Sequence, residues 1–286
     1  MTNESVFPPE RVSVVGVLNV TPDSFSDGGR LLGTDGLVDL DRLVARAGEL
    51  VAGGADVLDV GGESTRPGSR EVPLAEEIAR VEAAIGRLSQ AFPVPISIDT
   101  RKSEVARRAL AAGASLVNDV SGLAHDPELA HVVAESGAVV IVGHMRGVPE
   151  SMQRAPRYDD VLDEVAAGLA QSIEVARAAG VPSNRIVVDP GIGFGKRLED
   201  NLVLLAHAGW FRERLGVPVL VGPSRKSFIE AITGDPVVER DVASHAACAV
   251  AAFTGADAVR VHDAAGARRA VAMGRAIRGA RRKAVG

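Results

Sequence analysis

The sequence predicts an α/β fold, a single-domain (β/α)8 or TIM barrel, and three observations support it. Segments with helical spacing, such as 74–90 and 199–214, alternate with short runs rich in Val and Ile. Several helical segments end in Gly-Ala or Gly-Val, as helices returning to a sheet do. The Val- and Ile-rich runs number eight, at 13–20, 56–61, 95–99, 116–120, 138–143, 186–189, 218–222 and 258–262. Eight strand–helix units close best as a barrel, and a doubly wound open sheet is the alternative.

Composition excludes several classes of partner. Hydrophobic residues make up 46% of the 286 residues, charged residues 24%, and the formal net charge is −5. We therefore expect neither nucleic acid nor a membrane as the main partner. The first residues lack the pattern of a signal peptide, which predicts a cytoplasmic protein. Residues 1–11 are predicted to form a flexible arm, residues 12–282 the barrel, and Cys248 a packed thiol.

A polar residue follows each predicted strand, at the end where barrel enzymes carry their chemistry. Buried polar groups are costly unless paired, so this recurrence predicts a polar pocket at the barrel mouth. In chain order, these residues are Asn19, Glu63 with Ser64 to Arg66, Asp99, Asn118, His144, Asp189, Ser224 to Ser227, and Arg260 with His262.

The stretch Ile186–Lys196 is a clear example of this construction. Three apolar residues lead into Asp189, Pro190 stops the strand, and three glycines alternate in the following loop. A carboxylate before a glycine-rich loop is typical of a binding site, and an Asp capping the turn is the alternative. A nucleotide P-loop is excluded, because Arg197 follows Lys196 where Ser or Thr is needed.

The pocket residues fall into two chemical groups. One group suits the hydrogen-bonding edge of a flat heterocycle such as a pterin, and comprises Asp99, Asn118, Asp189 and Lys226. The other suits a doubly charged anion such as a phosphate, and comprises Asn19, Ser64, Thr65, Arg66, Arg260 and His262. Asn19 offers a neutral oxygen to a Mg²⁺ ion that bridges phosphates, which predicts Mg²⁺ as cofactor.

Seven motifs together resemble the dihydropteroate synthase family, in that family's order. They are Asn-Val-Thr-Pro-Asp-Ser-Phe-Ser-Asp-Gly-Gly (19–29), Gly-Gly-Glu-Ser-Thr-Arg-Pro-Gly (61–68), Ile-Asp-Thr (98–100), Asn-Asp-Val-Ser-Gly (118–122), Asp-Pro-Gly-Ile-Gly-Phe-Gly-Lys (189–196), Ser-Arg-Lys-Ser (224–227) and Arg-Val-His-Asp (260–263). The resemblance implies a reaction of 6-hydroxymethyl-7,8-dihydropterin pyrophosphate with 4-aminobenzoate, which gives 7,8-dihydropteroate and pyrophosphate.

The resemblance also implies a role for individual residues. The pterin would contact Asp99, Asn118, Met145, Asp189 and Lys226, and the pyrophosphate would contact Thr65, Arg66, Arg260 and His262. Asn19 would bind Mg²⁺, and 4-aminobenzoate would contact Phe25, Pro67, Phe194 and Ser227. Lys226, Arg66 and Asp27 would be catalytic, the last by stabilising a pterin methylene cation.

Two other functions remain open at this point. A pterin-dependent methyltransferase would share the heterocycle-binding residues without needing the pyrophosphate-binding ones. A catalytically silent pterin-binding paralogue would act through a partner subunit. The resemblance favours the synthase, acting on small-molecule substrates as a homodimer.

Overall fold

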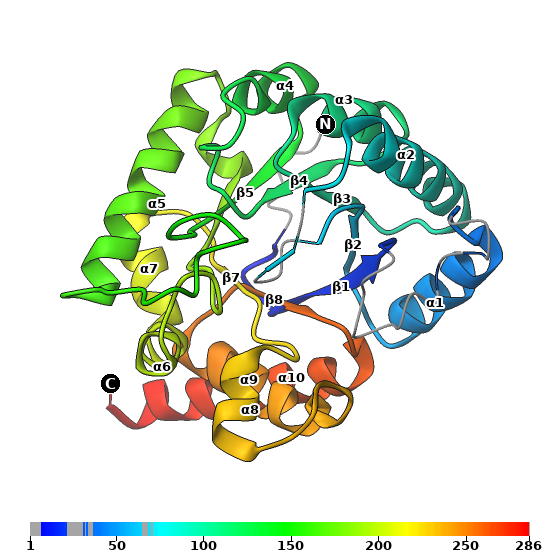
Figure 1. Cartoon of the computed structure of the whole chain (residues 1–286). Helices are drawn as coiled ribbons and strands as arrows, with labels where there is room; N and C mark the ends of the chain where they lie inside the picture. The colour runs from blue at the N-terminus through cyan, green and yellow to red at the C-terminus, as the bar shows by residue number, and fades with distance from the viewer. Residues whose placement is uncertain are drawn as a thin grey trace.

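The computed structural model describes residues 7–21, 31, 33, 37–64, 68–69 and 71–285. Eight parallel strands form one sheet in the order β6-β5-β4-β3-β2-β1-β8-β7. A parallel bridge between Val188 and Val219 joins the two ends, so the sheet closes into the predicted barrel (Figure 1). The strands are β1 (Ser13–Asn19), β2 (Val57–Gly61), β3 (Ile96–Asp99), β4 (Leu116–Asp119), β5 (Val139–Gly143), β6 (Ile186–Asp189), β7 (Leu220–Val221) and β8 (Ala258–Val261).

Helices surround the barrel and cover the outer face of the sheet (Figure 1). They are α1 (Leu40–Ala52), α2 (Leu74–Ala91), α3 (Ser103–Ala111), α4 (Leu129–Ser136), α5 (Val161–Ala178), α6 (Leu198–Ala206), α7 (Ala208–Leu215), α8 (Ser227–Thr233), α9 (Asp241–Thr254) and α10 (Ala264–Val285). Short 3-10 helices cover Ser183–Arg185 and Val237–Glu239. No helix in these ranges is long and apolar enough to cross a membrane.

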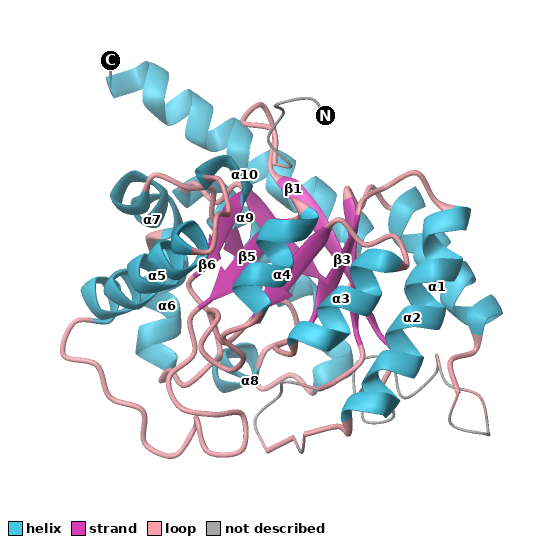
Figure 2. Cartoon of the chain, turned by 90° about the horizontal axis from the view of Figure 1, so that it is seen from above, coloured by secondary structure: helices cyan, strands magenta, loops and turns pink. Residues whose placement is uncertain are grey.

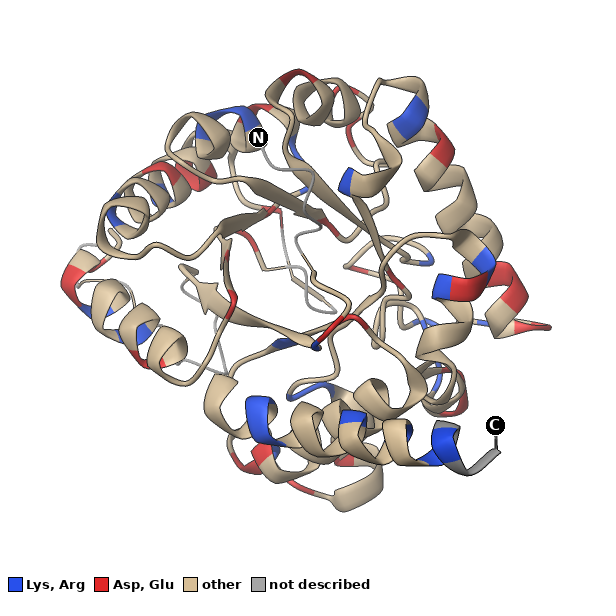
Figure 3. Cartoon of the chain, turned by 180° about the vertical axis from the view of Figure 1, so that it is seen from behind, with Lys and Arg blue, Asp and Glu red and all other residues tan. Residues whose placement is uncertain are grey.

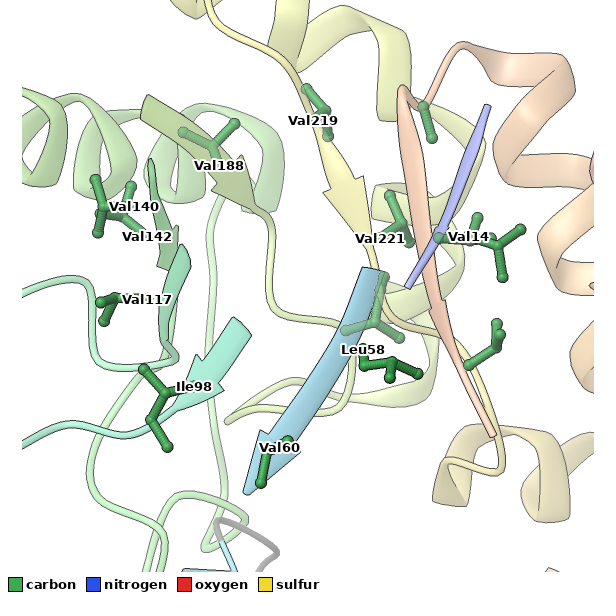
Figure 4. Packing of buried hydrophobic residues seen from close by; sticks show 14 of the residues in the cluster. Val14, Leu58, Val60, Ile98, Val117, Val140, Val142, Val188, Val219 and Val221 are labelled. Carbon is green, nitrogen blue, oxygen red and sulfur yellow. The ribbon is translucent and has the colours of Figure 1, made fainter. Parts of the chain in front are cut away.

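Alternate residues of each strand face the helices or the barrel interior. Leu58, Ile98 and Val117 belong to the apolar cluster that includes the helix side chains (Figure 4). The intervening positions therefore face inward. The positions of Asn19, Asp99, Asn118, Asp189, Arg260 and His262 all have this inward parity.

The amino-terminal end of the barrel is closed by apolar packing. Phe7 is 2% exposed and clusters with inward residues such as Val57 and Leu116. Arg268 of α10 donates to the carbonyl oxygen of Val12, which ties the entering chain to the last helix. The chain enters at this end, whereas the loops after the strands gather at the opposite end (Figure 2). Residues 7–11 are the described part of the predicted arm, and its boundary stays a prediction.

One helical element of the structure differs from the predicted one. The helical segment 199–214 is interrupted at His207, which lies between α6 and α7. Gly209 follows this break, and a Cβ there would lie 2.4 Å from the carbonyl oxygen of Thr254, so α7 packs closely against the end of α9. Cys248 is fully buried in α9, as predicted, and burial raises the pKa of its thiol to about 12.

Candidate active site

Strand register brings three predicted site residues into one row on the inner wall. Asn19 pairs with Gly61, Gly61 with Asp99, and Asp99 with Asn118. A Cβ on Gly61 would lie 3.5 Å from Oδ1 of Asn19 and 3.9 Å from Oδ2 of Asp99. The absence of a side chain on Gly61 therefore leaves these two oxygens facing a common space.

Asp189 and Lys226 form the opposite part of the pocket wall. A Cβ on Gly222 would lie 3.9 Å from both Oδ2 of Asp189 and Nζ of Lys226. Oδ1 of Asp189 accepts the amide of Gly191 at 2.8 Å, which fixes the carboxylate and directs its other oxygen inward. Burial raises the pKa of Asp189 and lowers the pKa of Lys226 to about 8. The pair offers one acceptor and one donor to a polar ring.

Arg260 lies between two buried carboxylates on the inner wall. Its Nε donates to Oδ2 of Asp59 at 2.6 Å, and its Nη2 donates to Oδ2 of Asp99 at 2.7 Å. Burial still raises the pKa of Asp99 to about 7, against the opposing charge of Arg260. Oδ1 of Asp99 is buried with no hydrogen-bond partner among the described residues, which leaves an unsatisfied acceptor inside the barrel.

Asp59 is a further residue of this wall that was not predicted from the sequence. Asp59 is fully buried in the middle of β2, and its Oδ2 also accepts Nδ2 of Asn118 at 3.4 Å. It thus orients Arg260 and Asn118 together. A carboxylate inside the apolar run Val57–Gly61, at an inward position, was the signal that could have found it.

The glycine-rich loop after β6 packs directly on the segment after β5. A Cβ on Gly191 would lie 1.9 Å from the carbonyl oxygen of His144, and one on Gly195 would lie 2.4 Å from that of Arg146. This approach brings Phe194 and Met145, both half-buried, to the same side of the mouth. Nζ of Lys226 lies 4.3 Å from the ring centroid of Phe194, a cation–π contact.

We expect Gly191→Ala to lower the free energy of unfolding by about 3 kcal/mol or more, because the new methyl group clashes with backbone. Gly216→Ala is the matched control: both glycines have φ of 72°, but a Cβ on Gly216 meets nothing within 4 Å. The control should lose only the roughly 1–2 kcal/mol of a left-handed alanine. Equal losses of unfolding free energy in the two variants, measured by urea unfolding, would show that the loops after β5 and β6 can separate without cost.

His262 and the start of α8 form another part of the mouth. Oγ of Ser224 lies 3.0 Å from Nδ1 of His262 and accepts the amide of His262 at 3.2 Å. Ser227 is exposed and begins α8. Arg225 has a positive φ of 57° and turns away to bind both carboxylate oxygens of Asp241.

Several polar strand-end residues do not face the pocket. Asp119 accepts the amides of Ser121 and Leu123, so it stabilises the turn after β4. His144 packs against α5, where a Cβ on Gly168 would lie 2.8 Å from its Cδ2. The predicted residues Phe25, Asp27, Thr65, Arg66 and Pro67 lie outside the described residues.

Charged residues lie both on the outer helices and on the strands of the barrel. Lys and Arg alternate with Asp and Glu on the outer helices, and charged segments also lie on strands within the ring (Figure 3). The inner set includes acidic Asp59, Asp99 and Asp189 and basic Arg260 and Lys226. Such a mixture of fixed donors and acceptors suits a neutral ring with both kinds of group.

Comparison with known proteins agrees with this geometry. The family model described as "Pterin binding enzyme" matches residues 15–262. A dihydropteroate synthase from Synechocystis sp. is 46% identical over 255 residues, which cover 89% of this chain and 86% of that protein.

Solved structures give the same result. The Yersinia pestis dihydropteroate synthase, in complex with a sulfonamide drug, has a TM-score of 0.89 and 40% identity, covering 94% of this chain and 95% of that one. The Burkholderia cenocepacia dihydropteroate synthase, complexed with 7,8-dihydropteroate, has a TM-score of 0.83 and 42% identity, covering 96% of this chain and 94% of that one. The chain therefore belongs to the dihydropteroate synthase family, a family of pterin-binding transferases.

Proposed function

We propose that the inner wall binds the pterin of 6-hydroxymethyl-7,8-dihydropterin pyrophosphate, and that 4-aminobenzoate binds beside it at the mouth. The arrangement of Asp99, Asn118, Asp189 and Lys226 carries this proposal. Its carboxylates accept from ring N–H groups, whereas the lysine and the amide donate to ring nitrogen and carbonyl. The product complex of the Burkholderia relative supports the same chemistry.

The pyrophosphate is proposed to lie toward Asn19, Arg260 and His262, with Thr65 and Arg66 completing its site. A Mg²⁺ ion would fit this donor set, because the side chain of Asn19 would offer it a neutral oxygen. When bound, the ion would neutralise charge on the leaving group. The guanidinium of Arg260 is already oriented by Asp59, so Arg260 would need little reorganisation to contact the pyrophosphate.

The proposed reaction is a dissociative alkyl transfer. The bond between the pterin methylene carbon and the ester oxygen breaks, and its electron pair leaves with pyrophosphate. The nitrogen of 4-aminobenzoate supplies the pair for the new C–N bond and loses one proton to solvent. An arylamine is neutral near pH 7, so no strong general base is required. Asp27 would stabilise the methylene cation, and Lys226 would hold the ring.

The second substrate is proposed to bind among Phe25, Pro67, Phe194 and Ser227. Phe194 presents an aromatic face at the mouth beside Lys226, which supports stacking or edge contact with a benzene ring. The amide of Ser227, in the first turn of α8, is a donor for the substrate carboxylate.

The test is an assay of pyrophosphate release with the pterin pyrophosphate and Mg²⁺. We expect release only when 4-aminobenzoate is also present, and we expect chelation of Mg²⁺ with EDTA to lower the rate at least about tenfold. Calorimetry with a pterin ligand is the companion measurement. Pterin binding without release would indicate a silent paralogue and contradict the proposal.

We also propose that the protein acts as a cytoplasmic homodimer. Val242, Met273 and Ile277 are 82%, 62% and 52% exposed on α9 and α10, the two helices that pack against each other. Apolar side chains on neighbouring helices support association of two copies there. Sedimentation would measure the oligomeric state directly.

A further inference from the structure

Lys196 is a buried lysine at the end of the glycine-rich loop. It is 3% exposed, and its Nζ has three partners, each at 3.1 Å: Nδ1 and the carbonyl oxygen of His144, and the carbonyl oxygen of Phe194. An ammonium group has three N–H donors. Each donor therefore has one acceptor, and the three acceptors come from two separate loops.

The two loops joined by Lys196 each carry a residue of the proposed site. His144 directly precedes Met145, and Phe194 is itself a partner through its carbonyl oxygen. We propose that Lys196 is a positioning residue: it anchors Phe194, which belongs to the proposed 4-aminobenzoate site, against the neighbouring loop that begins at His144. This inference rests on the proposed substrate site.

Other contacts join the same loops but do not hold Phe194 itself. The hydroxyl of Tyr158 donates to the carbonyl oxygen of Gly195 at 3.0 Å, and Nε2 of Gln153 donates to that of Gly193 at 2.8 Å. The carbonyl oxygens that accept these two bonds belong to Gly193 and Gly195, the residues directly before and after Phe194. Lys196 holds the intervening carbonyl of Phe194, whose amide donates to the carbonyl oxygen of Gly191 within the same loop, so Lys196 is the contact that ties this residue to the neighbouring loop.

The electrostatics argue against a purely space-filling role. Burial lowers the pKa of Lys196 to about 7, and the neighbouring charges of Lys226 and Arg146 act in the same direction. Asp189 and Asp200 oppose them. An apolar side chain such as methionine would fill the same space without the cost of desolvating a charge. The contribution of Lys196 is therefore the set of hydrogen bonds that its ammonium group donates to the two loops.

The contact also determines the tautomer of His144. Burial, together with the charges of Lys196 and Arg146, lowers the pKa of His144 to about 3, so the ring is neutral at physiological pH. At pH 6 the ammonium of Lys196 donates to Nδ1, and the ring proton must then lie on Nε2. This tautomer is a signature of the contact that can be measured without substrate.

The kinetic test compares Lys196→Met with wild type at pH 6.5. We expect KM for 4-aminobenzoate to rise about tenfold or more, with pterin affinity by calorimetry within about threefold, since a small displacement of a positioning group is costly. Arg197→Met is the matched control, because it removes the next basic side chain, which pairs with Asp200 and contacts neither loop carbonyl. Its KM should stay within about twofold of wild type.

An unchanged KM for 4-aminobenzoate in Lys196→Met, or an equal rise in the control, would overturn the inference. A wild type that forms no dihydropteroate would instead contradict the proposed function. If Lys196→Met does not fold, ¹⁵N NMR of the wild-type imidazole decides the question. The Nε2–H tautomer at pH 6 supports the contact, and an Nδ1–H tautomer or a charged ring overturns it.

Discussion

Asp189→Asn is expected to weaken binding of a pterin ligand on the order of a hundredfold or more. The carboxylate is buried, its Oδ1 is held by the amide of Gly191, and its Oδ2 faces the pocket beside Lys226. Hydrogen bonds to a charged group contribute about 1.5–3 kcal/mol each. The substituted amide also directs N–H donors toward ring N–H groups, so two donors would face each other. Calorimetry with a dihydropterin would measure the loss.

The size of the residue is nearly unchanged in this substitution, so the expected effect is chemical rather than steric. Asp163→Asn, at an exposed position in the first turn of α5, is the control for the general effect of losing a carboxylate. Its pterin affinity should equal that of wild type. Retention of full affinity by Asp189→Asn would mean that the ring does not use this carboxylate, and the proposed orientation would be wrong.

Arg260→Met is expected to lower the free energy of unfolding by about 3–5 kcal/mol. The guanidinium pairs with Asp59, which is fully buried, and with Asp99. Removing one member of a buried ion pair leaves an uncompensated charge, which costs more than the pair itself contributes. Methionine retains most of the apolar stem, so packing changes little. Urea unfolding monitored by circular dichroism gives the difference.

The double variant Asp59→Asn with Arg260→Met separates charge from packing. Arg260→Met leaves the charge on Asp59 unpaired, and Asp59→Asn removes that charge. The double variant should therefore be more stable than Arg260→Met alone. A double variant less stable than either single one would show that Asp59 acts mainly through Asn118 and the strand, rather than through Arg260.

Much of the fold followed from local patterns. The predicted runs at 186–189 and 258–262 are the strands Ile186–Asp189 and Ala258–Val261, because buried parallel strands require continuous apolar sequence. The break at His207 was not predicted. Beside the break, Gly209 packs closely against Thr254, which lies 45 residues further along the chain, so this contact is not visible in the local sequence.

The residues of the candidate site also divide into those that the sequence predicts and those that it does not. Asn19, Asp99 and Asn118 could be assigned to the mouth from sequence, because strand ends converge there in any barrel. Asp59 and Lys196 were not assigned to the site, since neither stands directly at the end of a strand. Their importance comes from partners distant in sequence, Arg260 for one and His144 for the other.

The alternation of strands and helices, the polar residues at the strand ends and the family resemblance could all be read from the amino-acid sequence. The fold was needed to show which of these residues face one another, that Arg225, His144 and Asp119 turn away, and that Asp59 and Lys196 orient the others. Local patterns specify whether a residue lies on a strand or at its end. Contacts across the pocket depend on strand register and closure, which bring distant parts of the chain within hydrogen-bonding distance.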